Sequence, residues 1–273
     1  MLRTVAHANR RLGHCVGLMV VAAALAGLPV SAATPSSLST SSVPVPTTLS
    51  TTASRVRPAV IGSRVIGRSV AGRPIHAYHV GDPASSRTAV VMSTMHGDER
   101  STRVIVNSLV DGGRVRGLDL WLVPVVNPDG LARNTRKNAR GVDLNRNFPF
   151  RWAPLDGRYE SGPKAASEPE TKALMRFFAR VRPRRVVSLH QPLHGVDVST
   201  RASRTFAQRL ANGLNLPHKR LTCGGVCHGT FTQWYIRRHP GVAVTVEYGR
   251  RPTRHRLTVA SPARMLAVLG GRR

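Results

Sequence analysis

Three separated segments of the sequence carry the residue types that bind metal ions and transfer protons. His96 and Glu99 stand three residues apart in the segment HGDE, whereas His190 and Glu247 come much later. A catalytic zinc commonly takes three protein ligands, imidazole or carboxylate, and keeps one position for water. We therefore expect His96, Glu99 and His190 to bind one zinc ion per chain, and Glu247 to act as the general base.

The placement of these residues supports the hypothesis more strongly than their types do. A His-x-x-Glu pair alone is usually structural or solvated, and so is a single histidine at the end of a strand. Here His96 directly follows one apolar run, His190 ends a second and Glu247 ends a third. Ligands of open α/β sheets bind at the carboxyl ends of the strands. The three positions are therefore predicted to meet.

Strand and helix patterns alternate along the folded part of the chain, which predicts an α/β fold. We expect a mostly parallel mixed sheet covered by helices on both faces. Residues 127–150 are predicted to form a long polar loop, and Ser167 with Glu170 a capping box at the start of a helix. Strands are predicted over residues 63–66, 75–80, 88–95, 118–126, 186–189 and 242–246, and helices over 100–109, 167–180, 202–214 and 261–269.

The N-terminal residues have the layout of an export signal. A basic start precedes an apolar run over residues 15–30, and small residues follow it. This pattern predicts a signal peptide over residues 1–32, cleaved after Ala32 or Ala33. An uncleaved anchor is the alternative, but Pro29 interrupts a run already shorter than the about 20 residues of a membrane span. We therefore expect no stable membrane span after processing, and a secreted or cell-envelope location.

The rest of the chain is predicted to contain one tether and one domain. Residues 33–55 are rich in Ser, Thr and Pro, a composition that cannot bury a core and predicts a flexible tether. Residues 56–273 are expected to form the catalytic domain.

The chain is strongly basic, with 41 Lys and Arg against 13 Asp and Glu and a formal net charge of +28. Such a charge attracts polyanions. Charge alone does not distinguish nucleic acid from an anionic cell-wall polymer or a membrane surface. Export favours the cell-wall polymer as a partner, and we expect no specific binding of nucleic acid.

Processing would leave two cysteines, Cys223 and Cys227, which can pair in an oxidising compartment. We therefore expect a disulfide that closes a small loop. A second metal site formed by these two residues with His228 is the alternative, although no fourth ligand is evident.

An ordered set of motifs resembles the zinc carboxypeptidases related to carboxypeptidase A. The resemblance extends from Ile66 to about Gly249, and HGDE and the short chain look most like the bacterial murein peptide amidase branch. The motifs are, in order, IGRSVAGRPIHAYHVG, STMHGDE, VNPDG, RKNARGVDLNRNFP, SEPET, SLH and TVEYG.

The resemblance implies a role for each motif. It gives the same zinc ligands and assigns general base and acid catalysis to Glu247. Arg136 in RKN would face the developing oxyanion, and Asn145 and Arg146 in LNRNF would bind the terminal carboxylate of the substrate. One departure is that the digestive enzymes carry a mobile tyrosine about twenty residues before the catalytic glutamate. Here that stretch reads GGVCH over residues 224–228, so the loop that shapes the pocket differs.

The predicted function is an exported zinc-dependent peptidase or amidase that hydrolyses a peptide bond near a free carboxylate. Cell-wall peptides are the expected substrates, for example at the bond between D-glutamate and diaminopimelate. A general metallocarboxypeptidase and an amino-acid deacylase are alternatives with the same zinc chemistry. A basic polyanion-binding protein with a degenerate metal site is an alternative of another class, which the complete set of metal and base residues disfavours.

Overall fold

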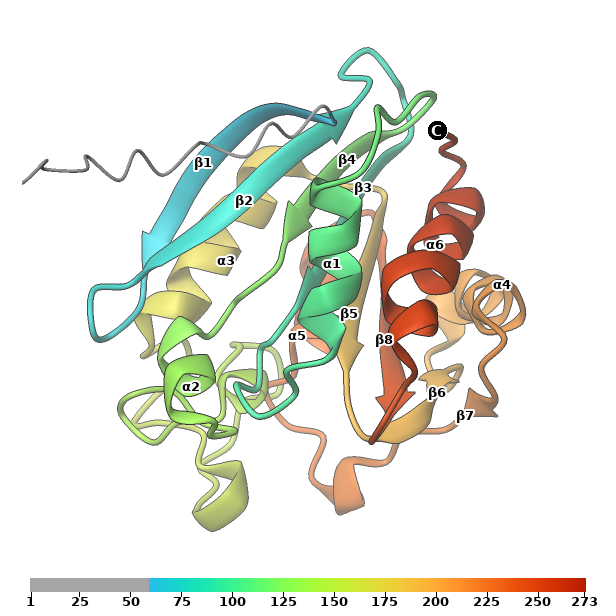
Figure 1. Cartoon of the computed structure of the whole chain (residues 1–273). Coiled ribbons are helices and arrows are strands. Elements are labelled where there is room, and N and C mark those ends of the chain that lie inside the picture. Colours follow the sequence, from blue (N-terminus) through green and yellow to red (C-terminus); the bar gives the residue numbers. More distant parts are fainter. Residues whose placement is uncertain (1–58) are drawn as a thin grey trace, which may run out of the picture. The chain divides into compact units, whose positions relative to one another are not determined.

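An eight-stranded mixed sheet forms the centre of the computed structural model, which describes residues 59–273 (Figure 1). The predicted signal peptide and tether lie outside these residues. The strand order is β1-β2-β4-β3-β5-β8-β6-β7. The strands are β1 (Val60–Arg68), β2 (Pro74–Gly81), β3 (Thr88–Ser93), β4 (Asp119–Val123), β5 (Arg185–His190), β6 (Leu193–Asp197), β7 (His218–Lys219) and β8 (Val242–Gly249).

The four central strands β4, β3, β5 and β8 are parallel. Toward one edge, β2 runs antiparallel to β4 and pairs antiparallel with β1, and toward the other edge β6 runs antiparallel to β8. The predicted α/β fold with a mostly parallel mixed sheet is confirmed.

Helices cover both faces of the sheet because alternate residues of the central strands face opposite sides. On β3, Val91 packs with α1, α4 and α6, whereas Met92 packs with α3 and α5. The short helix α2 lies beyond the carboxyl ends of the parallel strands (Figure 1). The helices are α1 (Thr102–Val110), α2 (Pro128–Arg133), α3 (Pro169–Val181), α4 (Arg204–Leu214), α5 (Phe231–Arg238) and α6 (Ser261–Leu269). Within residues 59–273, none of the helices is both long and apolar enough to cross a membrane.

Two local predictions were wrong, and three elements were missed. The loop over residues 127–150 contains α2 and a 3-10 turn at Leu144–Arg146, and the sequence did not reveal β6, β7 or α5. The capping box is absent, since Glu168 is the N-cap of α3. The hydroxyl of Ser167 instead donates to Glu168 Oε1 (2.7 Å), and Glu170 accepts from the N–H of Val70 (3.1 Å). The side chains of Ser167 and Glu170 therefore bind other partners and do not form the reciprocal hydrogen bonds of a capping box.

The parallel centre of the sheet brings the predicted site residues together. β3 and β8 flank β5, and His190 at the end of β5 is the register partner of Glu247 on β8. Glu247 therefore lies within its strand, two residues before its end at Gly249, rather than at the end. His96 follows β3 after a turn in which Thr94 has a φ of 55°.

The loop that carries His96 and Glu99 packs closely against the start of the segment that follows β4. A Cβ atom added to Gly97 would lie 1.9 Å from the carbonyl carbon of Gly130 and 2.3 Å from the N of Leu131. Only a residue without a side chain fits between these backbones.

We expect Gly97→Ala to destabilise the protein by about 1–3 kcal/mol, the usual cost of overpacking, and to weaken metal retention because Gly97 lies between two predicted ligands. Gly113→Ala is the matched control, since an added Cβ there meets nothing within 4 Å. Thermal unfolding and metal analysis measure both effects. A Gly97→Ala protein with the stability and metal content of the Gly113→Ala protein would contradict this account.

Candidate metal centre and active site

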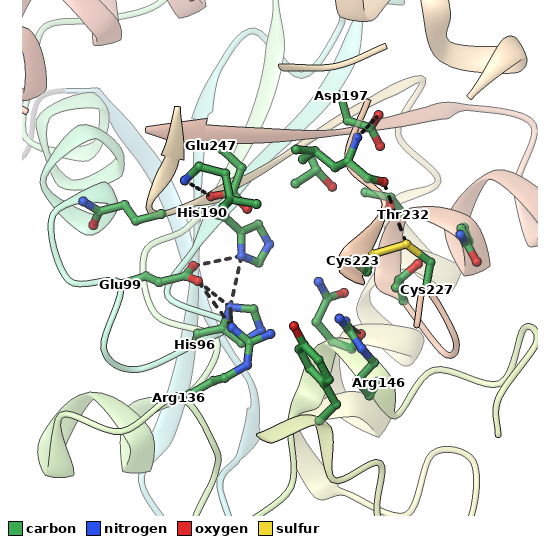
Figure 2. Close-up of a pocket in the computed structure, with 18 of the residues that line it drawn as sticks. His96, Glu99, Arg136, Arg146, His190, Asp197, Cys223, Cys227, Thr232 and Glu247 are labelled. Carbon is green, nitrogen blue, oxygen red and sulfur yellow. Dashed lines mark hydrogen bonds and ion pairs between the residues drawn. A yellow bond between two sulfur atoms is a disulfide. The ribbon is translucent and has the colours of Figure 1, made fainter. Parts of the chain in front are cut away.

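The three predicted metal ligands converge at the carboxyl edge of the sheet (Figure 2). One ligand atom from each of His96, Glu99 and His190 lies within 4.8 Å of the others, and all three residues are buried. The Nδ1 atom of His96 lies 2.6 Å from Glu99 Oε1, and the Nδ1 atom of His190 lies 2.9 Å from Glu99 Oε2. The two Nδ1 atoms are 3.3 Å apart.

The other ring nitrogen of each histidine is held from behind. His96 Nε2 lies 3.1 Å from Asp143 Oδ1, and His190 Nε2 lies 2.9 Å from the hydroxyl of Ser188. Outer partners of this kind fix the tautomer and the ring orientation of a metal-binding histidine. Both imidazoles therefore direct Nδ1 toward the same point.

The ligand group carries strongly shifted pKa values in the metal-free protein. Burial alone would lower the pKa of His96, but the carboxylates of Glu99 and Asp143 outweigh it and raise this pKa to about 9. Burial alone would raise the pKa of Glu99, but the two imidazoles lower it to about 2. Each group is thus held in its charged form by its neighbours.

Two imidazole nitrogens and a carboxylate that meet at one buried point match the donor set of a catalytic zinc. The rear contacts leave the Nδ1 atoms of His96 and His190 and the carboxylate of Glu99 as the groups directed at the ion. The residues present therefore fit zinc.

Glu247 lies beside this group and lines the same pocket (Figure 2). Its Oε2 atom accepts a hydrogen bond from the N–H of Leu193 (3.1 Å), and the residue is 7% exposed. Burial raises the pKa of Glu247 above its ordinary value, and His190 only partly offsets this. A carboxyl group with a raised pKa can both accept and return a proton near neutral pH.

Arg136 reaches the metal ligands from the side of α2. Its Nη1 atom lies 3.3 Å from His96 Nδ1. Its Nε and Nη2 atoms lie 2.9 and 2.8 Å from Asp143 Oδ2. This two-point contact fixes the guanidinium plane. Arg136 is therefore placed where positive charge can stabilise an oxyanion next to the metal group.

Asn145 and Arg146 line the other side of the pocket. The Oδ1 atom of Asn145 accepts from the N–H of Phe231 (2.9 Å), so its amide nitrogen is left to face the pocket. Arg146 is 3% exposed, and its guanidinium carbon lies 4.6 Å from the ring centre of Tyr159. Both residues present donors suited to a carboxylate.

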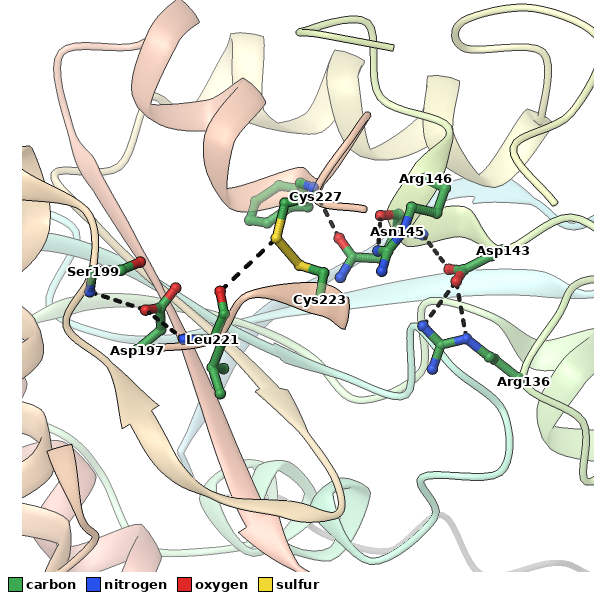
Figure 3. The surroundings of a disulfide bond; sticks show 10 residues. Arg136, Asp143, Asn145, Arg146, Asp197, Ser199, Leu221, Cys223 and Cys227 are labelled. Atoms are coloured by element: carbon green, nitrogen blue, oxygen red, sulfur yellow. Dashed lines mark hydrogen bonds and ion pairs between the residues drawn. A yellow bond between two sulfur atoms is a disulfide. The ribbon is translucent and has the colours of Figure 1, made fainter. Parts of the chain in front are cut away.

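A disulfide between Cys223 and Cys227 forms part of the pocket wall (Figure 3). The structure therefore commits both sulfurs to each other rather than to a second metal site, and His228 Nδ1 lies 3.1 Å from the carbonyl of Arg151 instead. No tyrosine lines the pocket from this loop. Tyr235 is buried, with its hydroxyl bonded to the carbonyl of Pro183 in the core, and Tyr159 enters the pocket from another segment.

Sequence reasoning assigned no role to four residues that the structure places at the site. They are Asp143, Tyr159, Ser188 and Asp197. Ser188 was signalled by its polarity within an apolar strand, two residues before His190. Asp197 was signalled by its rarity, because few acidic residues occur in this part of the chain.

Comparison with known proteins identifies relatives of this arrangement. The profile of the family described as zinc carboxypeptidase matches residues 52–198. Murein peptide amidase A of Escherichia coli strain K12 is 32% identical over 188 residues, which span 63% of this chain and 76% of that protein. The protein of the same name from Vibrio campbellii is 32% identical over 165 residues, or 55% of this chain and 65% of that protein.

Solved structures agree with the sequence matches. The murein-tripeptide amidase of Escherichia coli O157 superimposes with a TM-score of 0.65 at 29% identity, covering 76% of this chain and 91% of that one. Carboxypeptidase A of Helicoverpa armigera gives a TM-score of 0.65 at 18% identity, covering 78% of this chain and 68% of that one, and so shares the fold.

We expect zinc binding to the metal-free protein to release a proton at pH 7.5. The pKa of His96 is raised to about 9 there, so its imidazole is protonated and must lose the proton on Nδ1 to bind metal. Zinc affinity should accordingly rise with pH until about pH 9 and fall on acidification. Titration calorimetry in two buffers of different ionisation enthalpy measures the release.

His218→Ala, which removes an exposed histidine, is the control and should retain the release. Zinc uptake at one ion per chain without proton release would contradict the role given to His96. Full metal content in a His96→Ala, His190→Ala double variant would contradict the ligand set as a whole.

Proposed function

The chain belongs to the zinc carboxypeptidase family, and from this premise we propose that it is an exported hydrolase that cleaves cell-wall peptides next to a free carboxylate. Family membership makes it a zinc-dependent metallopeptidase. One observation supports the finer proposal most directly. A buried metal-binding group with its base and a pair of carboxylate-binding residues line a single pocket.

In the proposed mechanism, residues on one side of that pocket carry out catalysis and residues on the other side bind the substrate. His96, Glu99 and His190 would hold zinc, and the ion would supply Lewis-acid chemistry for a carbonyl group and for water. Glu247 takes the proton from the attacking water and passes it to the leaving nitrogen. Arg136 provides positive charge where the oxyanion develops.

Substrate binding is assigned to the opposite side. Arg146 has the planar fork that suits two-point contact with a carboxylate, and the Asn145 amide adds a third donor. Because Arg146 is buried against Tyr159, its guanidinium is held in position before substrate arrives.

Two features support cell-wall peptides as the substrates. The relatives matched by sequence above are murein peptide amidases. The chain also combines a predicted export signal with a net charge of +28, which suits an anionic cell-wall polymer as partner. We propose the bond between D-glutamate and diaminopimelate, in a secreted or envelope-held enzyme. A general metallocarboxypeptidase and an amino-acid deacylase share the chemistry and differ only in the pocket.

We expect Glu247→Gln to keep near-normal folding and zinc content while turnover falls by at least about 100-fold, because the base is lost but its shape remains. Glu160→Gln makes the same change outside the pocket lining and serves as the control. Steady-state kinetics and metal analysis of both variants are the measurements. A Glu247→Gln protein that kept most of its activity would refute the hydrolase mechanism.

We expect Arg146→Ala to raise the Michaelis constant for peptides with a free terminal carboxylate by about 10–100-fold, the value of a charged hydrogen bond. The same peptides in amidated form should be almost unaffected. Mass spectrometry of a panel of cell-wall peptides, ordinary L-peptides and acylated amino acids separates the three candidate activities. Cleavage of L-peptides or acyl groups without cleavage of cell-wall peptides would reject the finer proposal.

A further inference from the structure

Acidic side chains are very unevenly distributed along the chain. From Thr171 to Arg273 there are 20 Lys and Arg residues, but only Asp197 and Glu247 have carboxylate side chains. Both of them line the catalytic pocket (Figure 2). The mechanism uses Glu247 and gives Asp197 no task. A carboxylate retained there in so basic a region calls for its own explanation.

The fold directs Asp197 into the pocket. It is the last residue of β6, and its neighbour Val196 is buried in the core, so Asp197 faces the opposite side of the strand. Its Oδ1 atom accepts from the N–H groups of Ser199 (2.9 Å) and Leu221 (3.4 Å). The carbonyl of Leu221 in turn contacts Cys227 Sγ at 3.9 Å (Figure 3). Ser199 and Leu221, the latter in contact with the disulfide, thus position this carboxylate.

No cationic side chain among residues 59–273 forms an ion pair with Asp197. Lys219 is its register partner on β7 and the obvious candidate. The ammonium of Lys219 instead donates to the carbonyl of Leu193 at 2.6 Å. The negative charge of Asp197 is therefore available to a ligand in the pocket.

A purely structural role does not require this charge. The contact from Oδ1 to the N–H two residues later is an Asx turn, which asparagine forms equally well. Asp82 makes the same contact with the N–H of Ala84 (3.1 Å) outside the pocket lining. The turn explains a short polar residue at position 197, whereas the carboxylate itself points to a cation.

The two ends of the pocket are complementary in charge. The disulfide loop lies between Asp197 on one side and Asn145 and Arg146 on the other (Figure 3). A substrate residue whose carboxylate is bound by Arg146 can extend along this wall toward Asp197. Thr232 also lines this pocket and adds a hydroxyl group to its wall.

We infer that Asp197 determines specificity by binding a protonated amine on the substrate residue that is released, opposite the carboxylate bound by Arg146. This inference rests on the proposed function for the assignment of the released residue. Two sources offer the same chemistry, the side chain of a terminal lysine and the second amine of a diamino acid such as diaminopimelate.

The test compares the wild type with Asp197→Asn and with Asp82→Asn in the zinc-loaded full chain. The first substitution removes the charge and keeps the Asx acceptor, and the second makes the same change outside the pocket. Calorimetry measures the binding of lysine against norleucine, and of diaminopimelate against 2-aminopimelate, which lacks the second amine. In the wild type and Asp82→Asn, at least one amine should be preferred by about tenfold or more. In Asp197→Asn this preference should disappear, while norleucine and 2-aminopimelate bind as before.

The pair that shows the preference identifies the source of the amine. An equal loss of affinity for all four ligands in Asp197→Asn would show a structural role and overturn the inference, as would an unchanged preference. Because binding requires no turnover, the result stands apart from the proposed function. A wild type that preferred the amines but hydrolysed no peptide would refute the proposed function and leave the role of Asp197 supported.

Discussion

The site depends above all on one buried carboxylate, that of Asp143. It lies 3.1 Å from His96 Nε2, accepts from Arg136 Nε at 2.9 Å and accepts from the N–H of Asn145 at 2.9 Å. These contacts join a metal ligand, the oxyanion arginine and the turn that carries the carboxylate-binding residues. The charges of His96 and Arg136 hold the pKa of Asp143 well below its usual range despite burial. A buried charge is stable only when paired in this way, so loss of any partner would disturb the others.

Acidic and basic side chains are also divided unequally between the interior and the surface of the described part of the chain. Of the 13 acidic residues, six are buried, whereas Arg146 is the only buried Lys or Arg within residues 59–273. The acids bind histidines, arginines and backbone N–H groups inside the protein, and the bases cover its surface. The high net charge is thus a surface property, which leaves the internal electrostatics of the site to a few fixed pairs.

Features that depend on a short stretch of sequence, such as the central strands and the residues at their ends, could be predicted from the sequence. Apolar runs located the central strands, and their ends located His96 and His190, because the parallel topology brings strand ends together. The sequence did not reveal contacts between distant segments. Asp143 meets His96 across 47 residues of sequence. Ser167 and Glu170 satisfy a local capping pattern, yet Asn138 Nδ2 and Val70 N take the Glu170 carboxylate. Short strands such as β6 contain too few apolar residues to show the alternation of apolar and polar residues that predicts a strand.

The two halves of the pocket are built by different means, and this limits what the family can say about the substrate. The metal half is set by β3, β5 and β8, whose register places His190 beside Glu247. The other half is set by loops, where the ring of Tyr159 packs against Arg146 and a disulfide closes residues 223–227. The disulfide and the Arg146–Tyr159 contact place fixed groups in the wall of this half. The strands therefore position the groups for the chemistry, whereas the loops of this chain position the groups that can select a substrate.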